Sequence, residues 1–107
     1  MRLWRMTIMA GLAASMLMAT HASAASAVSV DIKDFTFAPV RLTVPVGATV
    51  TWTNHDEETH TVTSATGAFR SAGLGNEESF SETFTDPGTY QYFCALHPHM
   101  KATVIVR

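Results

Sequence analysis

The sequence predicts an all-β protein, built as an antiparallel sandwich or barrel of short strands. Apolar and polar residues alternate in several runs after residue 27, which is typical of strands with one buried face. Turn-forming residues separate these runs, and the strongest turn signal is Asp86-Pro87-Gly88. No segment after residue 24 repeats its apolar residues at helical spacing. These observations argue against a helical domain.

The alternation predicts each strand in turn. In chain order the expected strands span residues 28–32, 40–44, 49–53, 79–84, 89–94 and 102–106. A further short strand is expected at 61–63, directly after His60. Residues 64–79 contain three glycines and few large side chains, so we expect one long loop with at most a short helical turn. The core is expected to contain seven aromatic side chains: Phe35, Phe37, Trp52, Phe80, Phe84, Tyr90 and Tyr92.

The N-terminus has the layout of a secretory signal peptide. Arg2 and Arg5 precede a stretch without charges, and small residues follow it at Ala22-Ser23-Ala24. A transmembrane helix needs about 20 apolar residues, and this stretch is shorter. We therefore predict a signal peptide at 1–24, with cleavage after residue 24 or as late as residue 27. An uncleaved anchor is the alternative. The remaining domain, residues 25–107, would be periplasmic.

The size and charge of the chain exclude several classes of protein. A length of 107 residues corresponds to one domain, and a net charge of −2 lacks the basic balance of a nucleic-acid binder. We expect a monomer with no nucleic-acid partner and no stable membrane insertion. Cys94 is the only cysteine, so no internal disulfide can form. Small exported domains without disulfides often use a metal for stability, which directs attention to metal ligands.

One short segment collects the side chains that can bind a soft metal. It reads Cys94-Ala95-Leu96-His97-Pro98-His99-Met100, and a further histidine stands upstream at His60. Two imidazoles, one thiolate and a weak thioether form the ligand set of a blue-copper electron-transfer site. The sulfur donors favour Cu(I), and imidazole suits both oxidation states. A stiff β scaffold would hold a geometry that changes little between them.

These residues and their flanks resemble the cupredoxin family of type 1 blue copper proteins, and the amicyanin and plastocyanin group in particular. The matching stretches run from about residue 28 to residue 107. They are Val46-Gly47-Ala48-Thr49-Val50-Thr51-Trp52-Thr53-Asn54, His60-Thr61-Val62, Pro87-Gly88-Thr89-Tyr90-Gln91-Tyr92-Phe93-Cys94 and His97-Pro98-His99-Met100-Lys101. The short spacing from Cys94 to Met100 is similar to that of amicyanins. The resemblance implies a cupredoxin-like Greek-key sandwich that binds one copper ion.

The resemblance also implies a role for individual residues. It implies that the copper ligands are His60, Cys94, His97 and Met100. Asn54 corresponds to an asparagine that ties the ligand loops together. Thr61 stands where the family usually has asparagine. Its backbone N–H is expected to reach the Cys94 sulfur, but the side-chain link made by asparagine is not carried over. Ala102 replaces a common glycine, with only local consequences expected.

Other residues near these motifs receive simpler interpretations. His55 is expected to be a loop residue, and His99 to point to solvent beside His97. Phe69 and Leu74 are expected to cover the copper side of the core. The acidic runs 56–58 and 77–78 are interpreted as solvated loops or, alternatively, as a docking patch for a basic partner.

The function predicted from these residues is one-electron transfer by a periplasmic carrier, without enzymatic activity. Its partners would be redox proteins such as a dehydrogenase, a cytochrome c or an oxidase. Electrons are expected to leave at His97, where the flanking residues are apolar. The alternatives are a protein for copper storage, delivery or resistance, a zinc site that includes His99, and a thiol enzyme. Zinc rarely accepts a thioether, and no oxyanion site marks a thiol enzyme.

Overall fold

The computed structural model describes residues 11, 13–15 and 26–107. The predicted signal peptide at 1–24 lies outside the described residues, apart from residues 11 and 13–15, and so does the cleavage position after residue 24. No helix in the described part of the chain has the length and apolar character needed to cross a bilayer.

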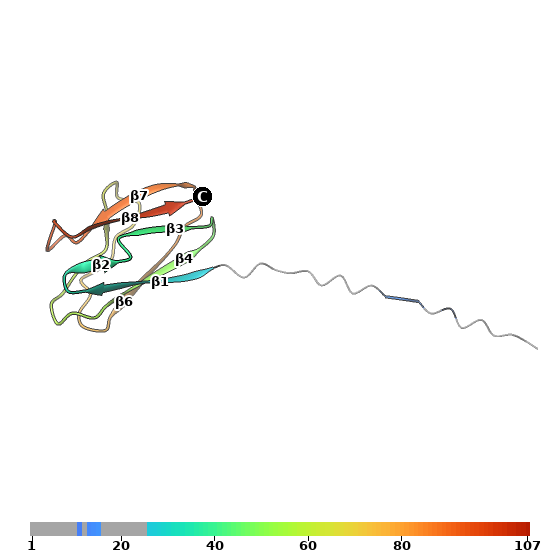
Figure 1. Ribbon diagram of the computed structural model, residues 1–107, viewed down its shortest axis with the longest axis horizontal. Coiled ribbons are helices and arrows are strands. Elements are labelled where there is room, and N and C mark those ends of the chain that lie inside the picture. The colour runs from blue at the N-terminus through green and yellow to red at the C-terminus, as the bar shows by residue number, and fades with distance from the viewer. Residues whose placement is uncertain (1–10, 12, 16–25) are drawn as a thin grey trace, which may run out of the picture.

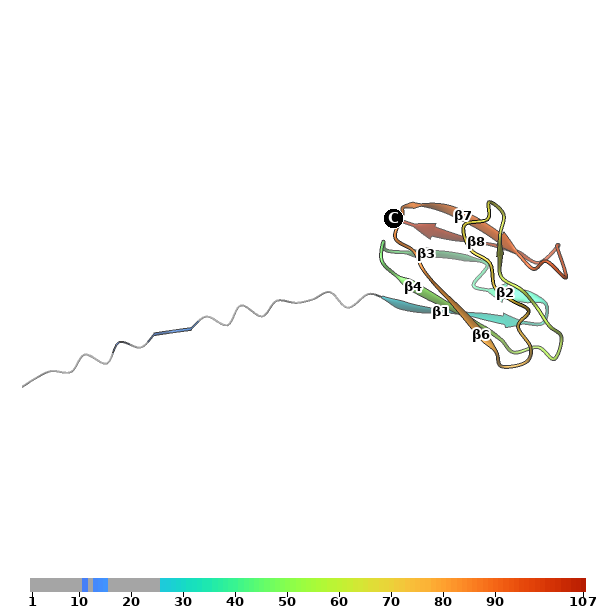
Figure 2. The same cartoon turned by 180° about the vertical axis from the view of Figure 1, so that it is seen from behind.

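Residues 27–106 form two four-stranded sheets that pack face to face (Figure 1). In spatial order the first sheet contains β2 (Thr36–Ala38), β1 (Ala27–Lys33), β4 (Thr49–Asn54) and β6 (Ser79–Thr83). The second contains β3 (Arg41–Val44), β8 (Lys101–Val106), β7 (Gly88–Phe93) and β5 (Thr63–Ser64). The C-terminus lies at the end of the sandwich opposite the loop that follows β7, as the reverse view also shows (Figure 2). The predicted all-β sandwich is confirmed.

Each sheet contains one parallel pair of strands among antiparallel ones. Strand β1 runs parallel to β4, and β3 runs parallel to β8. The chain leaves the first sheet after β2, adds β3 to the second sheet and returns as β4, so β4 re-enters beside β1 by a crossover. An alternating pattern shows which face of a strand is buried but not the direction of its neighbour. The sequence therefore could not distinguish these pairs from antiparallel ones.

Strand β4 shows how the alternation becomes a buried face and a polar face. Its residues Val50, Trp52 and Asn54 are buried. On the opposite face, threonines of β4 form hydroxyl–hydroxyl hydrogen bonds of 2.7–2.8 Å with residues of β6. These cross-strand pairs are Thr49–Thr83, Thr51–Ser81 and Thr53–Ser79. Such pairs each add a modest stabilisation and fix the register of the two strands.

The core is a cluster of aromatic rings around Trp52. The Trp52 ring lies 5.9 Å from Phe69 and 5.5 Å from Tyr92, and its Nε1–H donates to the Tyr92 hydroxyl at 3.1 Å. Burial raises the pKa of Tyr92 to about 12, although the hydrogen bond from Trp52 lowers it in part. Phe69 also contacts Phe84, at 5.4 Å. The expectation that Phe69 covers the copper side is therefore wrong, because its ring belongs to this central cluster.

The six longer strands match the expected runs, and the differences fall on short segments. Strand β2 was not expected, because three residues give too little alternation to detect. The strand expected at 61–63 is wrong in its bounds, because the observed strand β5 contains only Thr63 and Ser64. Residues 65–78 form the predicted long loop without a helix. This loop is fixed by isolated bridges from His60 to Leu74 and from Thr63 to Arg70.

Candidate metal centre

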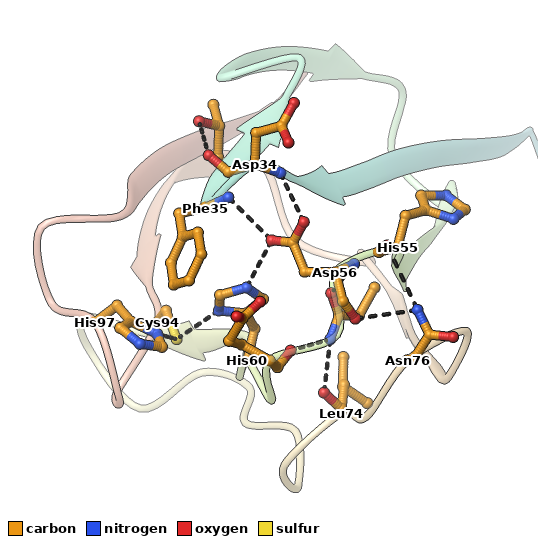
Figure 3. Close-up of polar contacts among 12 residues, drawn as sticks. Asp34, Phe35, His55, Asp56, His60, Leu74, Asn76, Cys94 and His97 are labelled. Atoms are coloured by element: carbon orange, nitrogen blue, oxygen red, sulfur yellow. Dashed lines mark hydrogen bonds and ion pairs between the residues drawn. The ribbon is translucent and has the colours of Figure 1, made fainter.

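Three of the predicted metal ligands converge at the end of the sandwich where β7 terminates (Figure 3). The Cys94 Sγ lies 3.7 Å from Nδ1 of His60 and 3.7 Å from Nδ1 of His97. The three donor atoms all lie within 4.8 Å of one another. His60 comes from the connection between β4 and β5, whereas Cys94 and His97 come from the loop after β7. The fold therefore brings two distant segments to one point.

Backbone hydrogen bonds explain the spacing of three residues between donors in the second segment. The His97 N–H donates to the Cys94 carbonyl at 3.2 Å, and the Met100 N–H donates to the His97 carbonyl at 2.9 Å. Turns closed by bonds between residues three apart place every third side chain on the same side. The Cys94 N–H donates to the Met100 carbonyl at 3.1 Å and closes the loop. Met100 is buried at its base, 3% exposed.

The two imidazoles differ in exposure. His60 and Cys94 are fully buried, whereas His97 is partly exposed. The expectation that His60 is the deeper histidine is confirmed. A buried thiol beside two imidazole nitrogens, with a buried methionine at the end of the same loop, is a donor set that suits copper. These residues therefore cluster like a type 1 copper site.

Thr61 connects the two donor segments twice. Its backbone N–H donates to the Cys94 Sγ at 3.3 Å, as predicted. Its Oγ1 accepts the Ala95 N–H at 2.7 Å, a side-chain link that was expected of asparagine but not of threonine. Both bonds span more than 30 residues along the chain. Threonine thus supplies a side-chain connection at the position where the family usually has asparagine.

Asp56 contacts His60 at Nε2, the ring nitrogen that does not face Cys94 (Figure 3). Its Oδ2 accepts the His60 Nε2–H at 2.8 Å and the Phe35 N–H at 2.9 Å, and its Oδ1 accepts the Asp34 N–H at 2.8 Å. Partial burial alone would raise the pKa of Asp56, but the hydrogen bonds from Phe35, Asp34 and His60 lower it below its ordinary value. Because Nε2 carries the donated proton, Nδ1 is left free to bind a metal.

The interpretation of residues 56–58 as a purely solvated acidic run is wrong for Asp56. Its side chain is only 10% exposed, whereas Glu57 and Glu58 are exposed. In the sequence the three residues form one continuous acidic run. The only local signal that could have separated them is the spacing of four residues between Asp56 and His60.

Phe35 lies over the site and not in the aromatic core, so that expectation is also wrong. Its side chain is 38% exposed, and its ring centroid lies 5.0 Å from both His60 and His97 in edge-on contacts. Asp34 and Phe35 both have positive φ angles, 54° and 56°, which L-residues rarely adopt. The two hydrogen bonds to Asp56 hold this turn in place. A hydrophobicity pattern carries no information on a positive φ angle, so the sequence did not show that Phe35 leaves the core.

Asn54 has the connecting role predicted for it, but between different segments. It is fully buried, and its Nδ2 donates to the carbonyls of Glu58 and Leu74 at 2.8 Å each. Its Oδ1 accepts the Asp56 N–H at 2.9 Å. Asn54 therefore ties the His60 segment to the 65–78 loop and not to the Cys94–Met100 loop. Leu74 lies directly beside His60 through paired backbone hydrogen bonds, as expected for a residue on the metal side.

Two further histidines among residues 26–107, His55 and His99, lie outside the donor cluster. His55 contacts Asp31 at 3.0 Å and Glu77 at 3.2 Å, and these two carboxylates, Asp31 first, raise its pKa. His99 is exposed, with its ring 6.4 Å from that of His97. The alternative of a zinc site that includes His99 therefore has no support among the described residues.

Known proteins are similar to this chain in fold and in sequence. Residues 6–106 match the Cupredoxin-like domain family. Amicyanin from Paracoccus denitrificans is 39% identical over 85 residues, which cover 75% of this chain and 65% of that protein. Amicyanin-alpha from Methylorubrum extorquens is 33% identical over 102 residues, which cover 91% and 86%. A solved structure of an amicyanin variant in its reduced Cu(I) form has a TM-score of 0.73 at 36% identity, over 78% and 85% of the two chains.

A two-sheet β-sandwich with a buried thiol and two imidazoles gathered at one end defines the class of small proteins with type 1 copper sites. The chain belongs to the cupredoxin family, and the resemblance noted from its motifs is confirmed. It spans just under two thirds of the length of two Paracoccus amicyanins, 65% and 66%.

Proposed function

We propose that this chain is a periplasmic one-electron carrier and not an enzyme, with one type 1 copper held by His60, Cys94, His97 and Met100. The observation that carries the proposal is the convergence of Cys94 Sγ with two imidazole Nδ1 atoms within 4.8 Å. Copper, when bound there, supplies the one-electron Cu(I)/Cu(II) couple. Four protein donors leave no open position for a substrate, which favours a carrier over an enzyme.

The residues around the donors support rapid electron exchange. Asp56 holds His60, and Thr61 donates to the Cys94 sulfur and braces Ala95. These bonds connect the donor segments independently of the metal, so the ligand geometry is expected to change little when the oxidation state changes. The full burial of His60 and Cys94 also argues against copper delivery, because transfer of the ion favours exposed and exchangeable donors.

The spectrum of the copper-loaded, oxidised protein tests this function. Thiolate-to-Cu(II) charge transfer should give an intense visible band, and one electron per chain should bleach it reversibly. Replacement of Met100 by glutamine should keep the colour and lower the reduction potential, because an amide oxygen favours Cu(II) more than a thioether does. A colourless copper complex, or a band that bleaches irreversibly, would exclude the proposal.

Redox proteins are the proposed partners, and the His97 end is their proposed contact surface. Leu96 is 56% exposed and Phe35 38% exposed, so apolar side chains flank the partly exposed His97. The exposed acids Glu57 and Glu58 lie in the connection to the other ligand, His60, and would raise the encounter rate with a basic partner. A cytochrome c is a suitable basic probe.

Two variants distinguish the apolar contact with the partner from long-range electrostatic attraction to it. Leu96→Asp should slow electron transfer to the cytochrome c at every salt concentration, because it places a charge inside the contact. Neutralising Glu57 and Glu58 should slow transfer mainly at low salt, where attraction is unscreened. An unchanged rate for Leu96→Asp would mean that electrons leave elsewhere.

Periplasmic location is part of the same proposal and rests on the N-terminal sequence. Export with cleavage would give a mature protein that starts at Ala25, or at Val28 if cleavage is as late as residue 27. Mass spectrometry of the protein recovered from the periplasm tests this. A full-length protein retained in the membrane would instead support the uncleaved anchor.

A further inference from the structure

The charges of this protein are divided between its two sheets. Eight of the nine acidic residues lie on the first sheet or close to the ends of its strands. They are Asp31, Asp34, Asp56, Glu57, Glu58, Glu77, Glu78 and Glu82. Four of the five basic residues after residue 24 lie on the second sheet or beside its strands. They are Arg41, Arg70, Lys101 and Arg107. The second sheet is therefore the basic side of an acidic protein.

A groove of about 780 Å³ crosses the outer face of this basic sheet. Strands β3, β7 and β8 line it, and its only charged lining residues are Arg41 and Lys101. Neither cation forms an ion pair with any described residue. Apolar side chains share the lining with them, including Val40, which is 57% exposed, and Phe93. The groove thus combines apolar contact area with two unneutralised positive charges.

The groove is also close to the donor cluster along the chain. Phe93 lines it and is bonded directly to Cys94, the thiol donor. Lys101 lies opposite Phe93 in the β7–β8 register. Pro98, from the loop that carries His97, closes one part of the groove. A molecule seated here would be one residue away from the sulfur, on the broad side of the second sheet and not at the His97 end.

We propose that this groove is a second docking surface, which receives an acidic segment of a redox protein partner. The proposal rests on the proposed electron-carrier function. Carboxylates of the segment would pair with Arg41 and Lys101, and its apolar side chains would contact Val40 and Phe93. One electron would pass between the partner's redox centre and the copper through Phe93 and Cys94, with no bond formed or broken. Partners of opposite charge could then use different faces of one carrier.

The occupant can be tested with a synthetic peptide of four glutamates around one tryptophan, added to the isotope-labelled Cu(I) protein. The expected result is chemical-shift change in the amides of Gln91, Phe93, Lys101 and Thr103, which an otherwise identical lysine peptide does not produce. The double variant Arg41→Gln/Lys101→Gln should weaken peptide binding about three- to tenfold at low salt. Lys33→Gln removes one positive charge from the first sheet. It is the matched control for Lys101→Gln, which removes one from the groove, and it should change peptide binding little.

Shifts confined to His97 and Leu96, or equal weakening by Lys33→Gln and the double variant, would overturn the proposal. Both groove cations are solvent-exposed, so the double variant is expected to fold. If it does not, Lys101→Gln alone provides the same comparison.

Electron transfer from small complexes distinguishes this proposal from the proposed function. Ferrocyanide, an anion, should reduce the oxidised double variant several-fold more slowly than the parent at low salt, because its groove has lost two positive charges. Hexaammineruthenium(II), a cation, should not be slowed. If neither complex reduces the protein, the carrier function itself fails. If both reduce every variant at the same rates as the parent, only the groove proposal fails.

Discussion

The aromatic core and the donor end of this sandwich are built by different interactions. Around Trp52, rings from both sheets and from the long loop pack at centroid distances of 5.4–6.4 Å, with one side-chain hydrogen bond among them. At the donor end, single side chains connect loops through hydrogen bonds, with Asp56 and Asn54 each making three. Burial of apolar area dominates the first region, and polar geometry dominates the second.

This difference teaches that the side chains that contribute most to stability and those that serve the metal site are largely different. The aromatic cluster around Trp52 contains no donor side chain, although Cys94 and Met100 are buried in the same hydrophobic core, and the donor end depends on loops that this cluster only positions. A substitution should therefore affect mainly the free energy of unfolding or mainly the metal centre, according to the region in which it falls. The four predictions below test that separation.

The largest effect is expected for Cys94→Ser. Loss of the thiolate should abolish the visible band of the copper-loaded protein, because no other side chain at the site supplies a sulfur-to-Cu(II) charge transfer of that intensity. The far-UV circular dichroism of the variant should remain that of a β protein. An intense blue or green variant would disprove the ligand assignment, and an unfolded variant would disprove the separation.

The opposite result is expected for Phe69→Ala. Removing this buried ring from the cluster around Trp52 should lower the free energy of unfolding of the apo protein by about 3–5 kcal/mol. The visible spectrum of the folded fraction should not change. Denaturant titration measures the loss, and Leu96→Ala is the control, because Leu96 is 56% exposed and its truncation should cost little. A shifted absorption band in Phe69→Ala would show that the two regions are coupled.

Asp56→Asn should affect both properties moderately, because Asp56 joins the donor His60 to a strained turn. The amide N–H₂ group of asparagine would face at least one of the three N–H donors that Asp56 accepts, those of Asp34, Phe35 and His60. One buried donor left without an acceptor lowers the free energy of unfolding by about 1–3 kcal/mol. Loss of the negative charge beside His60 should also raise the reduction potential, since a carboxylate stabilises Cu(II) more than Cu(I). Voltammetry and thermal unfolding measure the two effects.

Glu57→Gln is the matched control for Asp56→Asn. It removes the same charge from the neighbouring residue, which is exposed. Equal shifts of potential in the two variants would mean that Asp56 acts only through long-range charge and not through its hydrogen bond to His60.

The smallest effect is expected at His55, on the surface of the first sheet. Asp31 and Glu77 raise the pKa of His55 above 6.5 in the folded protein. The protonated form is therefore favoured by folding, so its stabilisation is complete below about pH 6.5 and is lost as the pH rises through the folded pKa. His55→Gln should remove this dependence. Unfolding curves collected for parent and variant between about pH 5 and pH 9 should converge at the alkaline end.

The sequence by itself determined the six longer strands, their buried faces and the candidate donors in the Cys94–Met100 loop. Alternation has a period of two residues, so it marks the inner face of β4 through Val50 and Trp52 without knowledge of the neighbouring strands. The spacing of Cys94, His97 and Met100 is equally local, because turns closed three residues apart place them on one side. Such signals reside within about ten residues of chain and do not depend on the topology.

Only the tertiary structure decided which residues support the donors and which faces are free. Asp56 accepts hydrogen bonds from Asp34 and Phe35, 22 and 21 residues earlier, and Thr61 braces Ala95 from 34 residues away. The parallel pairs and the groove beside Phe93 likewise depend on which strands become neighbours. A phenylalanine has the same apolar side chain in a core and over a metal site, so its residue type alone does not place Phe35. Its place is set by the positive φ of its turn and by the distant carboxylate that holds that turn, and neither leaves a local pattern in the sequence.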